Sequence, residues 1–251
     1  MNTIQKSKKK GKIFVLWFQG EDNAPNLIKL CISSIRRNSN GHEVIVLDNN
    51  NLKEWVGPLS RTVEKKFKDN VFSLQLKTDL IRLILLTKYN CLWIDATVFV
   101  SRPIPDCIFN QEFFTVIRKE ADQKDITGKI SPFLLGRGNS IRAKKVFECS
   151  AKLMLAYISN EDDLINYLLI ENIIDVSIRN NDWLKNLINE YYHNKKDILG
   201  LVKRLDDVYD ENTIQAIIND NIFNKLNFHQ NYLLNNGSQT TVYGHLLKEF
   251  L

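Results

Sequence analysis

The stretch from residue 77 to residue 103 constrains the fold of this chain more than any other. It begins with a segment of good helix formers, Thr78 to Lys88, whose leucine and isoleucine side chains are too apolar to remain in water. After a short break, the apolar run Leu92-Trp93-Ile94 indicates a buried strand. This strand ends on a carboxylate, Asp95, and open α/β sheets bind their ligands beside such strand ends. The stretch therefore predicts an α/β fold with a binding site next to Asp95.

The predicted helix carries an acidic and a basic side chain on one face. Asp79 and Arg82 are three residues apart and so share a face. We predict Thr78 as the N-cap, which places Asp79 in the first turn, where the helix dipole favours an anion. An ordinary exposed ion pair has the same spacing and contributes little to stability. The functional interpretation depends on Asp95, one helix length later, followed two residues on by the hydroxyl of Thr97.

The N-terminal part of the chain predicts a parallel sheet. The continuous apolar run at residues 13–18 is typical of a strand buried on both faces. An apolar stripe at residues 25–35, led by a proline, predicts a helix, and residues 44–47 form a second strand. The order strand, helix, strand favours parallel pairing. Binding groups are then expected at the strand ends, in segments 17–20 and 48–51.

The rest of the chain changes character near residue 140. The sequence predicts further extended segments at residues 98–100, 112–118 and 133–135, a mobile polar loop at 119–129, and helices at 52–68, 141–158, 164–174, 183–200, 201–219 and 241–251. A chain of 251 residues can build one sizeable core. We predict a single domain over residues 1–251, made of a flexible basic arm (1–11), an α/β core (12–135) and a mostly helical acceptor-side or lid region (140–251).

Charge and apolar patterning exclude several classes of protein. The net charge of +5 is modest, and the chain lacks the interleaved basic and aromatic residues expected of a nucleic-acid binder. Lysines gather at residues 6–12 and 65–68; a peripheral membrane contact, attraction to an anionic donor or acceptor, and a solvated N-terminus each explain them. No apolar run reaches the roughly 18 residues of a transmembrane helix. Residues 1–12 lack the apolar centre of a signal peptide.

Motif content narrows the enzyme classes further. The four cysteines and four histidines show no C-x-x-C, H-x-x-x-H or H-E-x-x-H spacing, which argues against a zinc site. A G-x-S-x-G elbow, a P-loop and a G-x-G-x-x-G motif are absent as well. Together with the missing signal peptide, the cysteines indicate reduced thiols in a cytoplasmic protein, which could also contact the inner face of the membrane.

The central motif resembles a known family. Lys77-Thr78-Asp79-Leu80-Ile81-Arg82 and Trp93-Ile94-Asp95-Ala96-Thr97-Val98-Phe99 resemble the motifs of the capsular polysaccharide synthesis proteins, which are related to the family-32 glycosyltransferases. That family carries a Ser-Asp-hydrophobic-hydrophobic-Arg helix and, in its capsular branch, a strand ending in Trp-Ile-Asp-Ala-Thr. The resemblance extends from about Ile13 to Pro105. It implies a GT-A-like fold, with a Rossmann-related, mostly parallel sheet flanked by helices and a mainly helical C-terminal part.

The resemblance also implies an activity and a donor site. It implies a bacterial glycosyltransferase that moves a hexose from a nucleotide-diphosphate sugar to a saccharide or lipid-linked acceptor, with retention of the anomeric configuration. It places Trp17, Gln19 and Asp48 at the edge that holds the nucleotide base and ribose, although buried aromatics are more often simply core. Asp79 and Arg82 would contact the donor sugar and a phosphate, and an Arg fork suits both tasks.

The resemblance further implies a metal site and a second acidic residue. A divalent cation, Mn²⁺ or Mg²⁺, is expected at Asp95 and Thr97, where it would stabilise the leaving pyrophosphate; a cationic Arg or Lys side chain could provide the same charge. Thr97 stands where the wider superfamily has a second aspartate, so we expect a weakened site whose missing oxygens the pyrophosphate supplies. Related retaining enzymes place an acidic residue at a helix start, and Asp163 is the best match and the second candidate catalytic residue beside Asp95. Acidic residues are also common there because of the helix dipole alone.

Two other functions stay open at this point. A non-catalytic nucleotide-sugar-binding or assembly protein would explain Thr97 as the trace of a decayed metal site. A nucleotidyltransferase or sugar-phosphate transferase on a similar sheet would release pyrophosphate or a nucleoside monophosphate in place of a nucleoside diphosphate. Neither the sugar nor the nucleotide, linkage or acceptor follows from the sequence.

Overall fold

The computed structural model describes residues 10–121 and 130–251, so most of the predicted arm (1–11) and of the predicted loop (119–129) lies outside the described residues. The elements in chain order are β1 (Lys12–Leu16), η1 (Glu21–Asn23), α1 (Asn26–Arg37), β2 (Glu43–Leu47), α2 (Leu52–Val56), α3 (Arg61–Lys68), α4 (Leu74–Lys88), β3 (Cys91–Ile94), β4 (Val98–Val100), η2 (Asp106–Asn110), β5 (Leu134–Arg137), α5 (Ile141–Asn160), α6 (Leu169–Arg179), α7 (Asp182–Tyr192), η3 (Val202–Arg204), α8 (Glu211–Asp220), β6 (Phe223–Lys225), β7 (Asn235–Asn236), β8 (Gln239–Thr240) and α9 (Val242–Phe250).

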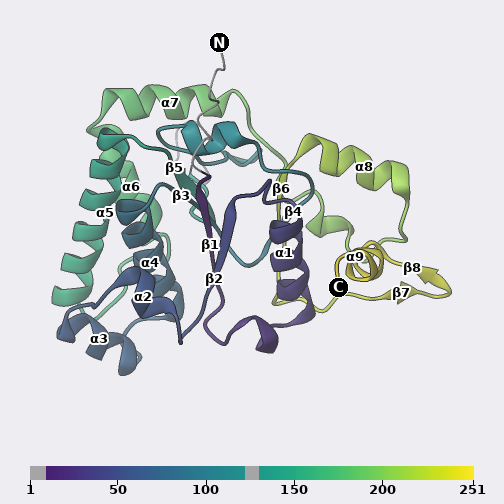
Figure 1. The fold of residues 1–251 in the computed structure, drawn as a ribbon, viewed down its shortest axis with the longest axis horizontal. Coiled ribbons are helices and arrows are strands. Elements are labelled where there is room, and N and C mark those ends of the chain that lie inside the picture. Colours follow the sequence, from purple (N-terminus) through teal and green to yellow (C-terminus); the bar gives the residue numbers. More distant parts are fainter. Residues whose placement is uncertain (1–9, 122–129) are drawn as a thin grey trace, which may run out of the picture.

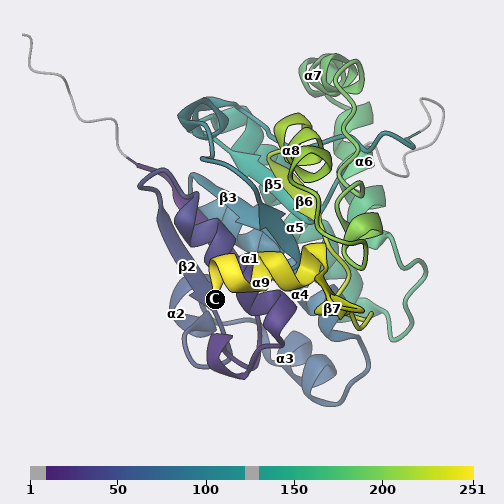
Figure 2. The same cartoon turned by 90° about the vertical axis from the view of Figure 1, so that its right-hand side faces the viewer.

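A four-stranded sheet in the order β2-β1-β3-β5 forms the centre of the molecule. Strand β1 runs parallel to β2 and to β3, and β5 is antiparallel to β3. Helices cover both faces of this sheet: α1 and α9 lie on one side, and α4 and α5 on the other (Figures 1 and 2). The predicted α/β fold with a mostly parallel sheet flanked by helices is confirmed.

Strand β1 shows why the core has two halves. Successive side chains of a strand point to opposite faces of the sheet. Phe14 and Leu16 pack into the cluster that contains the apolar side chains of α4 and α5, whereas Ile13 and Val15 pack against α1 and α9. All four side chains are buried. A strand covered on both faces requires apolar residues at every position, which is the pattern that predicted it.

Helix α4 begins one turn earlier than predicted. Its N-cap is Ser73, whose hydroxyl accepts a hydrogen bond from the backbone N–H of Leu76 at 3.3 Å. Thr78 lies inside the helix, where its hydroxyl donates to the carbonyl of Leu74 at 2.8 Å. The prediction of Thr78 as the N-cap is therefore wrong. Asp79 lies in the second turn, beyond the reach of the helix dipole, so its charge needs another partner.

The segment before α6 is not helical. The predicted helix at 164–174 begins only at Leu169, because the Tyr157 hydroxyl of α5 holds the preceding backbone in an irregular course. This hydroxyl donates to the carbonyl of Asp163 at 2.5 Å and accepts from the N–H of Ile165 at 2.8 Å.

Within the described residues, the structure contains no helix long and apolar enough to cross a membrane.

A second, two-stranded sheet returns the last quarter of the chain to the centre of the fold. Strands β4 and β6 pair antiparallel and bring Lys225 opposite Val98. The backbone N–H of Leu226 continues the ladder by donating to the carbonyl of Thr97 at 2.8 Å. The sequence did not predict β6, and its predicted strand at 112–118 is wrong, since that segment forms only two isolated bridges, at Phe114 and Arg118. The pairing places Lys225 beside the end of β3.

Candidate active site

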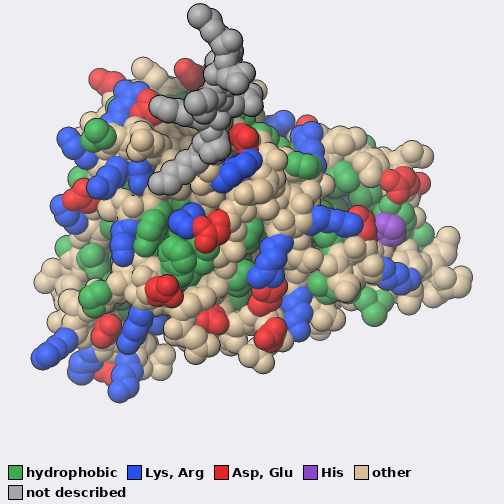
Figure 3. All heavy atoms as spheres, in the orientation of Figure 1, with side chains coloured by type: hydrophobic (Ala, Val, Ile, Leu, Met, Phe, Trp, Pro, Cys, Tyr) green, Lys and Arg blue, Asp and Glu red, His purple; other side chains and the backbone are tan. Residues whose placement is uncertain are grey.

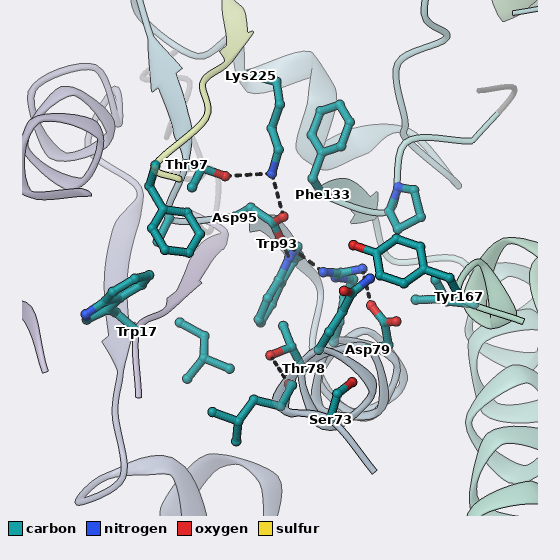
Figure 4. Close-up of a pocket in the computed structure, with 18 of the residues that line it drawn as sticks. Trp17, Ser73, Thr78, Asp79, Trp93, Asp95, Thr97, Phe133, Tyr167 and Lys225 are labelled. Atoms are coloured by element: carbon teal, nitrogen blue, oxygen red, sulfur yellow. Dashed lines mark hydrogen bonds and ion pairs between the residues drawn. The ribbon is translucent and has the colours of Figure 1, made fainter. Parts of the chain in front are cut away.

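A cavity of about 880 Å³ opens where β1 and β3 end. Ligand pockets in proteins typically measure about 300–1,000 Å³, so the cavity has room for a ligand of the size of a nucleotide sugar. Six of the residues predicted from the sequence line it: Trp17, Gln19, Asp79, Arg82, Asp95 and Thr97. The structure therefore brings the end of β1, the central helix α4 and the end of β3 to one site, as the strand-end argument predicted (Figure 4).

Four charged side chains in the cavity wall form a continuous series of ion pairs, which we call the ion-pair chain: Asp79, Arg82, Asp95 and Lys225. Arg82 donates from Nη1 to Asp79 Oδ1 at 2.9 Å and from Nη2 to Asp95 Oδ1 at 3.0 Å. Lys225 Nζ donates to the other oxygen of Asp95 at 2.9 Å (Figure 4). Two carboxylates alternate with two cations, so each buried charge has a partner of opposite sign, as burial requires.

Asp95 is the centre of this chain, and both of its oxygens are occupied. Besides Arg82, Oδ1 accepts a hydrogen bond from Trp93 Nε1 at 2.8 Å. Lys225, on Oδ2, also donates to Thr97 Oγ1 at 2.6 Å. Burial alone would raise the pKa of Asp95, but the charges of Lys225 and Arg82 outweigh it and hold that pKa below its usual range. Asp95 is therefore a permanent anion that fixes two cations in the wall.

Asp79 lies deeper, with its side chain only 6% exposed. Burial raises the pKa of Asp79 to about 6, although the neighbouring Arg82 acts in the opposite direction. Arg82 is shared with Asp95, so its charge neutralises Asp79 only in part. The two carboxylates of the ion-pair chain, Asp79 and Asp95, thus differ in proton affinity because their surroundings differ.

We expect the stability of the wild type to fall, relative to Asp79→Asn, as pH rises from about 4 to about 6. The folded Asp79 keeps its proton up to about pH 6, whereas an unfolded aspartate loses it near pH 4. The folded state binds more protons between these values, so raising the pH favours unfolding there by on the order of 3 kcal/mol at most. Urea unfolding of both proteins across this range measures the difference. A difference independent of pH would show that Asp79 is ionised throughout.

Asp48 lies outside the cavity wall. Its carboxylate accepts hydrogen bonds from the backbone N–H groups of Asn50 at 2.8 Å and Asn51 at 3.0 Å, which closes the turn after β2. These backbone hydrogen bonds, led by that of Asn51, lower the pKa of Asp48. The structure gives Asp48 a local role in the turn, and its predicted contact with the nucleotide stays a prediction.

Asp163 is exposed and does not line the cavity. The sequence predicts a helix start at Asp163, but the helix begins six residues later, at Leu169. The acidic residue in the first turn of α6 is Glu171, which is 5% exposed and belongs to the cavity wall. The predicted helix boundary was wrong, because Tyr157 holds residues 163–165 out of the helix. A catalytic role for an acidic residue at this helix start stays a prediction.

The donor set does not fit the divalent cation that was predicted at Asp95 and Thr97. A metal ion between Asp95 Oδ2 and Thr97 Oγ1 would occupy the position of Lys225 Nζ, which already binds both atoms. In residues 10–121 and 130–251, no group of three or more His, Cys, Asp or Glu side chains could hold a metal ion. A hard cation needs several oxygen ligands, and here cationic side chains have taken them. Use of a metal by the protein stays a prediction.

Aromatic side chains make up much of the remaining wall. Trp17 and Phe228 meet edge to face with ring centroids 5.4 Å apart, and Lys225 Nζ lies 4.9 Å from the Phe133 ring centroid. Tyr167 is 67% exposed and borders the cavity from the segment before α6. Figure 4 shows Trp17 and Tyr167 on opposite sides of Asp95. Of these residues, only Trp17 was predicted from the sequence.

Comparison with known proteins identifies the family. The family model of the capsular polysaccharide synthesis proteins ("Capsular polysaccharide synthesis protein") matches residues 1–246. Among solved structures, the chain is similar to one described as "PaToxG Glycosyltransferase", with 14% sequence identity over 83% of each chain and a TM-score of 0.41. No curated protein matches the chain. Because the family model covers nearly all of its 251 residues, the chain belongs to the capsular polysaccharide synthesis protein family.

Proposed function

We propose that the protein is a glycosyltransferase that moves a hexose from a nucleotide-diphosphate sugar to a saccharide or lipid-linked saccharide in capsular polysaccharide synthesis. The observation that carries this proposal is the composition of one cavity wall. Three kinds of side chain lie around Asp95. They are carboxylates that can accept hydrogen bonds from sugar hydroxyls, cations that can bind a diphosphate, and rings that can stack on a base or a sugar. Such a combination suits a ligand that is at once sugar, phosphate and base.

Different residues of the cavity wall are assigned to different parts of the donor. We propose that Trp17 lies on the side of the nucleotide, that the diphosphate meets the cations beside Asp95, and that Tyr167 faces the acceptor. Asp79 would accept hydrogen bonds from hydroxyl groups of the transferred sugar. The two terminal nitrogens of Arg82 are engaged by Asp79 and Asp95, so we assign it the positioning of these carboxylates in place of a direct phosphate contact.

Transfer requires the bond between the anomeric carbon and the diphosphate to break, with negative charge growing on the departing oxygen. Cations already fixed in the wall can stabilise this charge without rearranging during the reaction. The acceptor hydroxyl forms its bond to the anomeric carbon on the face that the departing oxygen leaves, and its proton passes to the departing diphosphate. Retention at that carbon is part of the proposal on the strength of the family resemblance, and NMR of the product's anomeric proton tests it.

We expect one nucleotide-diphosphate sugar to stabilise the protein in a thermal-shift screen across sugars and bases. A ligand at about 100 times its dissociation constant adds about 2.7 kcal/mol to the free energy of unfolding. Incubated with that donor and a saccharide acceptor, the protein should release the nucleoside diphosphate. Arg179→Met, on the exposed face of α6 outside the cavity, should leave the shift unchanged.

The products distinguish the alternatives. Release of pyrophosphate or of a nucleoside monophosphate would identify a nucleotidyltransferase or a sugar-phosphate transferase. Tight donor binding without turnover under any acceptor would identify a binding or assembly protein. Failure of every donor to bind would end the proposal.

The surroundings of the protein stay predictions. On the face shown in Figure 3, basic and acidic side chains are interspersed. We propose a cytoplasmic protein whose contact with the inner face of the membrane is peripheral, and no nucleic-acid partner. Sedimentation with vesicles that carry anionic lipid tests the membrane contact.

A further inference from the structure

We infer that Lys225 supplies, as a built-in cation, the positive charge that a divalent metal was expected to supply, so that the diphosphate is bound and released without a metal. This inference rests on the proposed function, because it concerns the diphosphate of the donor. It assigns a specific ligand contact to a residue that no sequence motif marked.

The position of the ammonium group is the first support. Lys225 Nζ lies 2.9 Å from Asp95 Oδ2 and 2.6 Å from Thr97 Oγ1, the two residues predicted to hold the metal. Its side chain is 24% exposed and lines the cavity. An ammonium group has three donors, and two are directed at Asp95 and Thr97, which leaves the third for a phosphate oxygen in the cavity.

The charge at this position is the second support. A pair of aspartates is matched by a divalent ion, whereas one aspartate and one threonine hydroxyl are matched by a single positive charge. Thr97 therefore fits an ammonium partner, which needs acceptors and no second carboxylate. A divalent ion added here would lie against the existing cations Lys225 and Arg82 and be repelled by both.

The backbone is the third support. Thr97 immediately precedes β4, and Lys225 ends β6, which pairs with β4. The N–H of Leu226 donates to the Thr97 carbonyl at 2.8 Å, so one ladder fixes both partners. Lys225 Nζ also lies 4.9 Å from the centroid of the Phe133 ring. A lysine is usually flexible, but this one is held in place before any ligand arrives, which is what electrostatic catalysis requires.

The test measures binding and turnover with and without metal. UDP and GDP serve as probes in calorimetric titrations, run once in EDTA and once in Mn²⁺, and the donor found in the thermal-shift screen serves for turnover. The variants are Lys225→Met, which keeps an unbranched side chain of nearly the same length without its charge, and Lys225→Arg, which keeps the charge. Lys66→Met is the matched control: Lys66 is 15% exposed and ion-paired to Asp162 at 2.9 Å, but lies outside the cavity.

We expect the wild type to bind one nucleoside diphosphate equally well in EDTA and in Mn²⁺. Lys225→Met should weaken that binding about 10-fold or more and lower turnover by about 100- to 1,000-fold. Lys225→Arg should recover part of both losses, and Lys66→Met should behave as the wild type. Thermal unfolding of each variant confirms that it is folded.

Two results would overturn the inference. One is a wild type that binds or turns over only with Mn²⁺, an outcome that leaves the glycosyltransferase proposal intact and that can be reached without any variant. The other is a folded Lys225→Met protein with wild-type affinity and turnover in EDTA. If no nucleoside diphosphate binds and no donor is consumed in either condition, the proposed function itself fails, and the role of Lys225 fails with it.

Discussion

Asp95→Asn should lower turnover by about 100- to 1,000-fold, the loss typical when one preorganised polar group is removed from an active site. Asp95 separates the two cations of the wall: Arg82 on one oxygen and Lys225 on the other. An amide has the same shape but no charge, so the cations repel each other and leave their positions. Neither cation is then in position to bind the diphosphate. Steady-state turnover of the identified donor measures the effect.

A second aspartate provides the control for this experiment. Asp175 is 17% exposed, against 23% for Asp95, and is likewise paired with an arginine, Arg179, at 2.5 Å, but it lies on α6 outside the cavity. Asp175→Asn should keep wild-type turnover. If Asp95→Asn also keeps it, the ion-pair chain is only a structural feature and the assignment of the active site is wrong.

Arg82→Met should destabilise the protein by about 3–5 kcal/mol, because it leaves the buried carboxylate of Asp79 without its partner. Arg82 is 4% exposed and is the only arginine in the ion-pair chain, where it contacts Asp79 and Asp95. Asp95 retains Lys225, but Asp79 is left buried and must take up a proton. The loss corresponds to a decrease in Tm of about 10 °C for a chain of this size. Urea or thermal unfolding measures it.

The double variant Asp79→Leu/Arg82→Met separates stability from function. Replacing a buried pair by apolar side chains of similar volume is often neutral, so most of the lost stability should return. Turnover should stay low, because the sugar-side carboxylate and the anchor of Asp95 are both missing. As a control, Arg179→Met removes an ion pair whose arginine is 75% exposed and should cost at most about 1 kcal/mol. An Arg82→Met protein as stable as the wild type would contradict the stabilising role given to Arg82 in the ion-pair chain.

Local sequence patterns predicted the central part of the fold because they are set by burial. The unbroken apolar run of β1 is required by a strand covered on both faces, and the run that forms β3 has the same origin. A carboxylate directly after such a strand lies at the edge of the sheet, because the strand itself is buried. For this reason Asp95 could be placed in the site from the sequence alone, and α4, which precedes the strand, brought Asp79 and Arg82 with it.

Contacts distant in sequence could not be predicted in this way. Lys225 reaches Asp95 across 130 residues, and the three residues of β6 carry no alternation that would reveal a strand. The acidic residue of α6 was missed for a different reason: one tyrosine hydroxyl of α5 delays the start of the helix, so the acidic group at the predicted start was Asp163 and not Glu171. Both cases depend on tertiary partners that local propensity does not contain.

The short ladder between β4 and β6 also determines when the site can exist during folding. Strands β1 and β2 and the helix between them are neighbours in sequence and can pair early, whereas Lys225 must close a loop of 130 residues before it meets Asp95. Contacts of such separation form slowly and carry a large entropic cost of closure. We therefore expect the charge arrangement to assemble after the β1–β2 unit, so a chain whose first strands have paired can still lack a working site.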